Sequence, residues 1–222
     1  MIRMQRLKSK AFYQEPDSAC HFTDQTLPEP FTMSVILASQ SSYKQSQLHS
    51  LGVSFEIVTP NLDEDHSTLL SPEALAVHLA KEKATTVQAC HPEAIIIGSD
   101  QTAELNDGHL LTKPETRDNA IKQLQQSSGQ TARFHSAVCV IHRQHISAWS
   151  VETQVKFRLL TAEEITRYVD ADKPLDCAGS FKIESLGIAL FDSVQSNDPS
   201  ALVGLPLISL AEQLRQHGLT IP

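Results

Sequence analysis

The sequence predicts an α/β protein with a mixed, twisted β-sheet flanked by helices. Short apolar runs alternate along the chain with helical segments, an order typical of strands and helices packed in layers. One run, Ala94 to Gly98, is continuously apolar, as expected for a strand that is buried on both faces. Two longer runs, Ala132 to Ile141 and Ile146 to Phe157, are separated by a short polar turn and predict an antiparallel pair within the sheet.

The N-terminal elements of this domain carry clear start and stop signals. Val35 to Ala38 predicts a short buried strand, followed by the serine-rich turn Ser39-Gln40-Ser41-Ser42 and a helix that ends at Gly52. Serine is a favoured N-cap, and glycine suits the residue after a helix. Phe55 to Val58 predicts a second strand, and Ser71-Pro72-Glu73 begins a long helix with serine as its cap.

The later elements are predicted from turns and caps. Asn106-Asp107-Gly108 is typical of a hairpin turn within Thr102 to Leu111. Thr161 to Glu164 is a capping box that begins a helix toward Val169. Further helices are predicted at Glu115 to Gln126, from Asp198-Pro199 onward, and at Leu205 to Gln216.

The first 32 residues differ from the rest of the chain. Met1 to Thr32 has no clean period, is interrupted by prolines and begins with several basic residues. We expect residues 1–32 to be a disordered N-terminal extension, or the product of an upstream start with Met33 as the working initiator. Residues 33–222 are expected to form one domain.

Composition limits the classes of partner. The chain has 222 residues, a net charge of 18 − 26 = −8, and 41% hydrophobic residues, as in an ordinary globular protein. The acidic balance and the 5% aromatic content argue against a nucleic-acid polymer as partner. No apolar run approaches the roughly 20 residues that span a bilayer, so no membrane partner is expected.

The cysteines and histidines do not indicate a metal centre. Cys20, Cys90, Cys139 and Cys177 are scattered and form no CxxC pair, which argues against a disulfide framework and favours a cytoplasmic protein. His142 and His145 have a spacing that could hold a metal. They lie between two predicted strands, however, which favours a solvated hairpin turn.

Three polar features point to phosphate chemistry. The serine-rich turn precedes a helix, and a helix N-terminus is a ready anion site. Lys44 lies in the first turns of that helix, where a cation opposes the helix dipole; a phosphate neighbour would explain it, and a solvated lysine is the alternative. Asp100 follows a buried strand, where α/β proteins place reactive groups, and a turn aspartate that caps a loop is the less favoured alternative.

A carboxylate cluster and two more lysines complete the candidate set. Asp63-Glu64-Asp65 offers the oxygen ligands that hard divalent cations prefer, with a solvated acidic loop as the alternative. Lys83 and Lys113 are isolated cations that would each be assigned to the surface if taken alone.

Taken in order, these segments resemble the Maf family of nucleoside triphosphate pyrophosphatases, and most closely the branch that acts on 7-methyl-GTP. The resemblance covers the chain from Met33 onward. The matching stretches are Ile36-Leu37-Ala38-Ser39, Asp63-Glu64, Glu82-Lys83-Ala84, Gly98-Ser99-Asp100-Gln101, Lys113-Pro114, Cys177-Ala178-Gly179-Ser180-Phe181-Lys182-Ile183-Glu184 and Leu202-Val203-Gly204-Leu205-Pro206.

The resemblance implies a fold, a reaction and roles for individual residues. It implies two lobes around a central cleft, as in inosine triphosphatases, and hydrolysis of a nucleoside triphosphate substrate to the monophosphate and pyrophosphate. It also implies a divalent metal, Mg²⁺ or Mn²⁺, and leaves a homodimer open. The implied roles are Asp100 as proton acceptor, Glu64 and Asp100 on the metal, Ser39, Lys44, Lys83 and Lys113 on the phosphates, and Tyr43, Gln101 and Glu184 in substrate specificity.

The chemistry of the base agrees with that branch. 7-Methylguanine is cationic, and Tyr43 could stack on it through a cation–π contact. Glu184 could accept hydrogen bonds from both donors on the Watson–Crick edge, whereas it would repel the two carbonyls of a pyrimidine. Without the family context, Tyr43 would be a half-buried helix aromatic and Glu184 a loop acid.

The serine-rich turn departs from the family pattern S-P-R-R. Here it continues Ser41-Ser42-Tyr43-Lys44-Gln45, so a lysine replaces the bidentate fork of an arginine, and we expect weaker phosphate binding. Two alternatives therefore stay open: a dTTP or UTP pyrophosphatase of the same family, and a nucleotide-binding regulator of cell division with little turnover.

Overall fold

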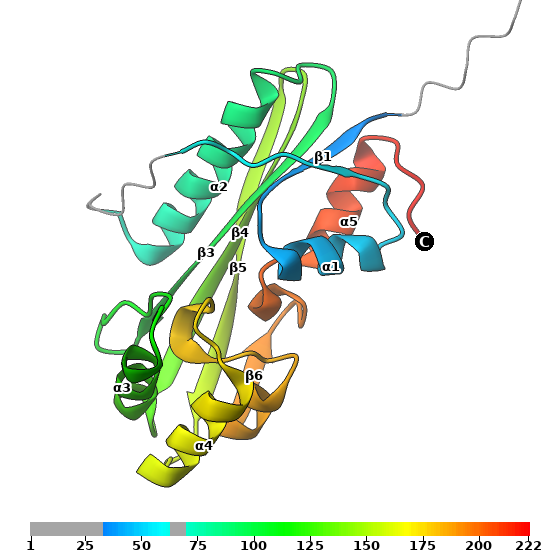
Figure 1. Ribbon diagram of the computed structural model, residues 1–222. Coiled ribbons are helices and arrows are strands. Elements are labelled where there is room, and N and C mark those ends of the chain that lie inside the picture. The colour runs from blue at the N-terminus through cyan, green and yellow to red at the C-terminus, as the bar shows by residue number, and fades with distance from the viewer. Residues whose placement is uncertain (1–32, 63–69) are drawn as a thin grey trace, which may run out of the picture. The chain divides into compact units, whose positions relative to one another are not determined.

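The structure is a computed structural model that describes residues 33–62 and 70–222. Its centre is a six-stranded sheet in the order β2-β1-β3-β4-β5-β6 (Figure 1). β1 pairs in parallel with β2 and β3, and the remaining neighbours pair antiparallel. The α/β class with a mixed sheet is therefore confirmed. The strands are β1 (Val35–Ala38), β2 (Glu56–Ile57), β3 (Ile95–Leu105), β4 (Thr131–His142), β5 (His145–Phe157) and β6 (Phe191–Ser196).

Helices cover both faces of the sheet, and alternate residues of each strand face them. Leu37, Ile95 and Ile97 pack with α1 and α5, whereas Ile36 and Ile96 pack with α2 on the opposite face. Figure 1 shows α2 on one side and α1 with α5 on the other. These helices are α1 (Ser42–Ser50), α2 (Pro72–Gln88) and α5 (Leu207–Gln216).

A third apolar cluster lies where β3, β4 and β5 extend beyond β1. Phe134 and Phe157 are its largest fully buried side chains, and Phe181 packs edge-on against both rings. Further members come from α3 (Arg117–Ser127), α4 (Ala162–Asp172) and the short 3₁₀ helix η2 (Leu186–Leu190). Another short 3₁₀ helix, η1 (Ala178–Ser180), directly precedes Phe181.

The unequal lengths of β1 and β3 position the site. β1 pairs with β3 only as far as Ala38 and Gly98. Within the described residues, no strand pairs with this edge of β3 from Ser99 to Thr102. The edge closes again at Ala103, whose carbonyl accepts a 2.8 Å hydrogen bond from the Leu111 amide. The result is a short open edge in the middle of the sheet.

Some of the predicted elements differ from those observed. The strand predicted at Ala94 to Gly98 continues to Leu105, so that the turn at Asn106-Asp107-Gly108 comes at its end. β6 was not predicted because it is an edge strand with mostly exposed, polar residues and no apolar alternation. The His142 to His145 hairpin turn is confirmed.

The helix predicted from Asp198-Pro199 was wrong. The chain turns there, and the short 3₁₀ helix η3 (Ala201–Val203) follows. The buried Asp198 carboxylate instead accepts hydrogen bonds from the amides of Ser200, at 3.0 Å, and Ile208, at 2.8 Å. It therefore caps α5, ten residues later, across a loop. No helix among the described residues is long and apolar enough to cross a membrane.

Candidate active site

A cavity of about 1060 Å³ lies along the open edge of β3. One side of it is built from the serine-rich turn, α1 and α2, and the other from segments that precede α3 and follow α4. This position agrees with a cleft between two lobes. The predicted site residues that line it are Ser39, Tyr43, Lys44, Lys83, Asp100, Gln101, Lys113 and Glu184. Glu64, the other residue predicted to bind metal, lies outside the described residues.

Lys83 and Asp100 form an ion pair within this cavity. The Nζ atom of Lys83 donates to Oδ1 of Asp100 at 2.6 Å, and the two side chains are only 12% and 13% exposed. Lys83 comes from α2 and Asp100 from β3. The pair therefore depends on how closely the helix approaches the strand.

Gly98 permits that approach. A Cβ atom at this position would lie 2.2 Å from the Ala80 carbonyl oxygen and 2.7 Å from the Ala84 amide nitrogen, both in the backbone of α2. Contacts this short cannot occur, so only glycine lets the helix backbone lie against the strand. The glycine of the Gly98-Ser99-Asp100-Gln101 motif thus sets the position of Lys83.

The serine-rich turn provides the N-terminus of α1 and directs Lys44. The Ser41 hydroxyl caps the helix by accepting from the Lys44 amide, and the Ser41 amide donates to Oγ of Ser39 at 3.2 Å. The Lys44 ammonium reaches across the open edge and donates to the Ser99 carbonyl at 2.9 Å. The helix dipole disfavours a cation at this end of α1. The hydrogen bond to the Ser99 carbonyl gives the Lys44 ammonium a favourable partner next to Asp100.

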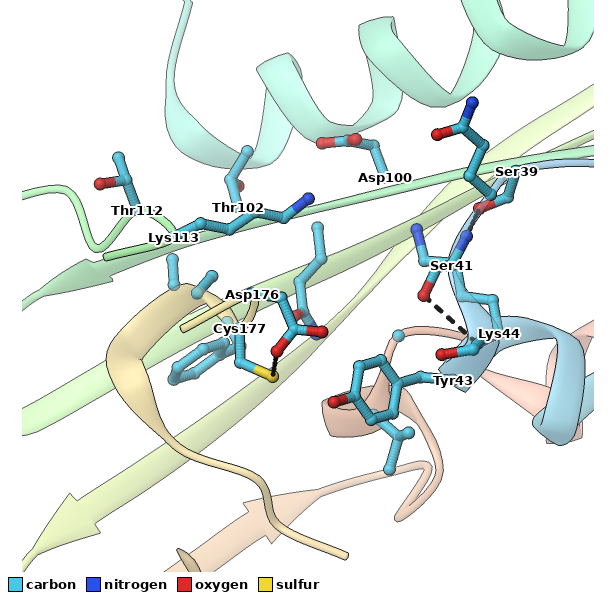
Figure 2. A pocket seen from close by; sticks show the side chains of 18 of the residues that line it. Ser39, Ser41, Tyr43, Lys44, Asp100, Thr102, Thr112, Lys113, Asp176 and Cys177 are labelled. Atoms are coloured by element: carbon cyan, nitrogen blue, oxygen red, sulfur yellow. Dashed lines mark hydrogen bonds between the residues drawn. The ribbon is translucent and has the colours of Figure 1, made fainter. Parts of the chain in front are cut away.

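Tyr43 lies among acidic and thiol groups at another part of the cavity. Figure 2 shows the ring of Tyr43 beside the side chains of Asp176 and Cys177, while Asp100 and Lys113 lie along the strand above them. Burial raises the pKa of the Tyr43 phenol above its ordinary value, and the nearby Cys177, Asp176 and Glu184 raise it further. Burial, with Asp176 beside it, also raises the pKa of the Cys177 thiol to about 12, so this thiol is neutral at physiological pH.

Gln101 contacts the cavity wall. Its side-chain nitrogen donates to the hydroxyl of Ser136 at 2.8 Å and to the carbonyls of Ala201 and Leu202 at 3.3 and 3.1 Å. Lys113 is exposed, and in Figure 2 its side chain extends along β3 toward Asp100. The cations and Asp100 therefore gather on one side of the cavity, and Tyr43 lies with the acids on the other.

Three residues for which the sequence predicted no role also line the cavity: Thr102, Asp176 and Cys177. Thr102 follows Asp100 by two residues, the strand period, and its hydroxyl donates to the Pro72 carbonyl at the start of α2. Asp176 directly precedes the Cys177-to-Glu184 motif, and that adjacency was the available signal. The described residues contain no group of three or more histidine, cysteine, aspartate or glutamate side chains placed to hold a metal ion.

Comparison with known proteins identifies the family. The family model described as Maf-like protein matches residues 34–217. The chain belongs to the Maf family. The motif residues around Asp100, Lys83 and Lys113 are therefore Maf-family segments that the fold brings to one cavity.

Similar Maf-family proteins cover most of this chain. A 7-methyl-GTP pyrophosphatase of Xanthomonas axonopodis pv. citri is 52% identical over 188 residues, which span 85% of this chain and 98% of that protein. A 7-methyl-GTP pyrophosphatase of Aromatoleum aromaticum is 47% identical over 190 residues, 85% of this chain and 97% of that protein. The solved structure of the Staphylococcus aureus Ham1 protein aligns with 84% of this chain at 11% identity and a TM-score of 0.49, a likeness too weak to support an inference.

Proposed function

We propose that this chain hydrolyses 7-methyl-GTP to 7-methyl-GMP and pyrophosphate. The observation that carries the proposal is the division of charge within one cavity. Lys83 contacts Asp100, Lys44 contacts the adjoining Ser99 carbonyl and Lys113 extends toward Asp100, whereas Tyr43 lies beside Asp176 and Cys177. A triphosphate suits the first side and a cationic base the second. The relatives named 7-methyl-GTP pyrophosphatase support the same substrate.

In the proposed reaction, water attacks the α-phosphorus and pyrophosphate leaves. Lys83 holds Oδ1 of Asp100 at 2.6 Å, so the carboxylate has a fixed orientation. Asp100 orients the water and accepts its proton. Lys44 and Lys113 then stabilise the negative charge that grows on the leaving pyrophosphate.

A divalent metal fits the donor set of this site. Mg²⁺ is commonly bound through one or two carboxylates together with substrate phosphates and water. Asp100 supplies one carboxylate at the lysine-lined side of the cavity, and we propose Glu64 as the second. When bound, Mg²⁺ or Mn²⁺ would polarise the phosphate oxygens.

At the other side of the cavity, Tyr43 and Glu184 read the base. The Tyr43 ring offers a face for a cation–π contact, worth about 0.5–2 kcal/mol. The Glu184 carboxylate lines the same cavity as Tyr43 and is near enough to raise the pKa of the phenol. It can accept hydrogen bonds from both edge donors of 7-methylguanine. We propose that the enzyme acts on the free nucleotide in the cytoplasm, where thiols such as Cys177 stay reduced.

A pyrophosphate-release assay tests this function. It compares 7-methyl-GTP, GTP, dTTP and UTP, with Mg²⁺, with Mn²⁺ and with EDTA. We expect metal-dependent preference for 7-methyl-GTP and a fall in kcat of about 10²–10⁴-fold in Asp100→Asn. Asp192→Asn, which removes the same charge from exposed strand β6, is the matched control and should retain activity.

The outcomes separate the alternatives. Near-normal turnover in Asp100→Asn would show that another group activates the water. Preference for dTTP or UTP would retain the family and reject base recognition by Tyr43 and Glu184. Tight nucleotide binding with no release from any substrate would favour the regulatory alternative.

A further inference from the structure

Asp176 lies at the base side of the cavity and has no role in the mechanism above. It directly precedes the motif that begins at Cys177, and it lines the same cavity as Tyr43 and Glu184. The two acids reach Tyr43 from different points of one segment, eight residues apart. The base side therefore carries two carboxylates, of which only Glu184 has been given a partner on the substrate.

Cys177 connects Asp176 to the aromatic ring. Cys177 lies near Tyr43 and, after burial, is the first cause that raises the pKa of the phenol. The thiol in turn donates to Oδ1 of Asp176, with 3.5 Å between sulfur and oxygen. Figure 2 shows the Asp176 carboxylate above the sulfur of Cys177, on the same side of the cavity as the Tyr43 ring.

The charges on this side of the cavity are mainly negative. Cys177 is neutral because its pKa is about 12, which leaves Asp176 and Glu184 as the acids beside Tyr43. Lys182, from the same segment, lowers the pKa of Cys177, but by less than Asp176 raises it. A base stacked on Tyr43 thus meets a net negative field. Such a field attracts a cationic purine and gives a neutral purine of the same shape no comparable gain.

We infer that Asp176 is a specificity-determining residue that selects the cationic, N7-methylated purine over the neutral one. Glu184 matches the hydrogen-bond donors that the methylated and unmethylated bases share. Asp176 reads the charge by which they differ. This inference rests on the proposed function, because it assumes that the base occupies the Tyr43 side of the cavity.

The test compares 7-methyl-GTP with GTP in the full chain and in Asp176→Asn, which preserves the shape of the side chain. Asp176 is exposed to solvent, which limits its electrostatic effect, so we expect the ratio of the two kcat/KM values to fall by no more than about five-fold, which corresponds to roughly 1 kcal/mol. The fall should come from 7-methyl-GTP alone, with kcat/KM for GTP unchanged. Added salt should reduce the ratio in the wild type and have less effect in the variant.

Asp107→Asn is the matched control. Asp107 is an exposed carboxylate in a hairpin turn and does not line the cavity, so its removal gives the same change in net charge. Its substrate ratio should equal that of the wild type. An equal loss with both substrates in Asp176→Asn would show a structural role, and an unchanged ratio would show no role. Either result overturns the inference.

A second readout does not depend on hydrolysis. Calorimetry measures the binding of 7-methylguanosine and guanosine, which lack phosphates, to the wild type and to Asp176→Asn. A preference for the methylated nucleoside that falls in the variant supports Asp176 even if no nucleotide is hydrolysed. Equal affinities of the wild type for both nucleosides overturn the inference even if pyrophosphate is released.

Discussion

Replacing Gly98 by alanine should both displace α2 and destabilise the protein, and the two effects can be measured separately. The added Cβ would lie 2.2 Å from the Ala80 carbonyl oxygen and 2.8 Å from Cβ of Ala84. A carbon and a non-bonded oxygen approach to about 3.3 Å, so the helix must move away by about 1 Å. The atoms that the new Cβ would meet belong to a helix backbone and a methyl group, and neither can rotate aside.

The displacement has two consequences of predictable size. Overpacking of this kind costs about 1–3 kcal/mol of folding free energy. Lys83 precedes Ala84 on the same helix, so its 2.6 Å contact with Asp100 should lengthen to about 3.6 Å, beyond hydrogen-bond distance. A misplacement of about 1 Å can cost 10²-fold in rate, so we expect kcat/KM to fall by about that factor.

Urea denaturation and pyrophosphate release measure the two effects separately. Gly52→Ala is the control, because Gly52 has φ +70° and no atom within 4 Å of an added Cβ. It should lose about 1–2 kcal/mol from backbone strain alone and keep full activity. The reasoning is refuted if folded Gly98→Ala retains activity within about two-fold, or if Gly52→Ala loses as much activity as Gly98→Ala.

Two further predictions concern Gly204 and His217. Gly204 has φ +136°, and in Gly204→Ala the new Cβ would lie 3.1 Å from Cε of Lys44, so the lysine should shift. The KM for the triphosphate should then rise about five-fold, roughly 1 kcal/mol, with little change in kcat. An unchanged KM in Lys44→Met would show that this lysine does not bind phosphate. Burial, with His142 and His145 nearby, lowers the pKa of His217 below its ordinary value of about 6.5. Below that pH the unfolded chain binds more protons than the folded chain, so the free energy of unfolding falls as the pH falls. The urea midpoint measured from about pH 8 to pH 5 should therefore drop less in His217→Asn than in the wild type, and equal slopes would contradict this assignment.

Most of the fold could be predicted because its signals are local. The caps at Ser41, Ser71 and Thr161 and the continuous apolar run of β3 are each contained in a few residues. The role of Asp198 could not be predicted from such local signals. Its carboxylate caps α5 from ten residues away, a contact that no nearest-neighbour pattern contains. β6 gave no signal because an edge strand needs no apolar alternation.

Residue types predicted the site better than they predicted the contacts within it. The spacing of Lys44, Lys83 and Asp100 along the chain gave no indication that they meet. They meet because β1 is shorter than β3 and leaves an edge open beside α1 and α2. The role of Asp176 was also hidden, because its significance depends on a tyrosine more than a hundred residues earlier in the sequence.

The Leu202-to-Pro206 motif shows how a mostly apolar stretch can support a polar site. Its backbone carbonyls accept hydrogen bonds from side chains of the site elements. The Ser99 hydroxyl donates to Gly204 at 3.0 Å, and the Gln101 amide donates to Leu202 at 3.1 Å. Gln47, one turn beyond Lys44 on α1, contacts both the amide and the carbonyl of Leu205.

These contacts give the segment a physical task. Buried backbone groups must be paired, and here the pairs join α1 and β3 to the same short loop. The loop therefore holds the serine-rich turn and the open edge of β3 in register. Because Gly204 lies against the stem of Lys44, the same loop limits where the ammonium can go. A substitution at Gly204 should thus alter phosphate binding before it alters the core.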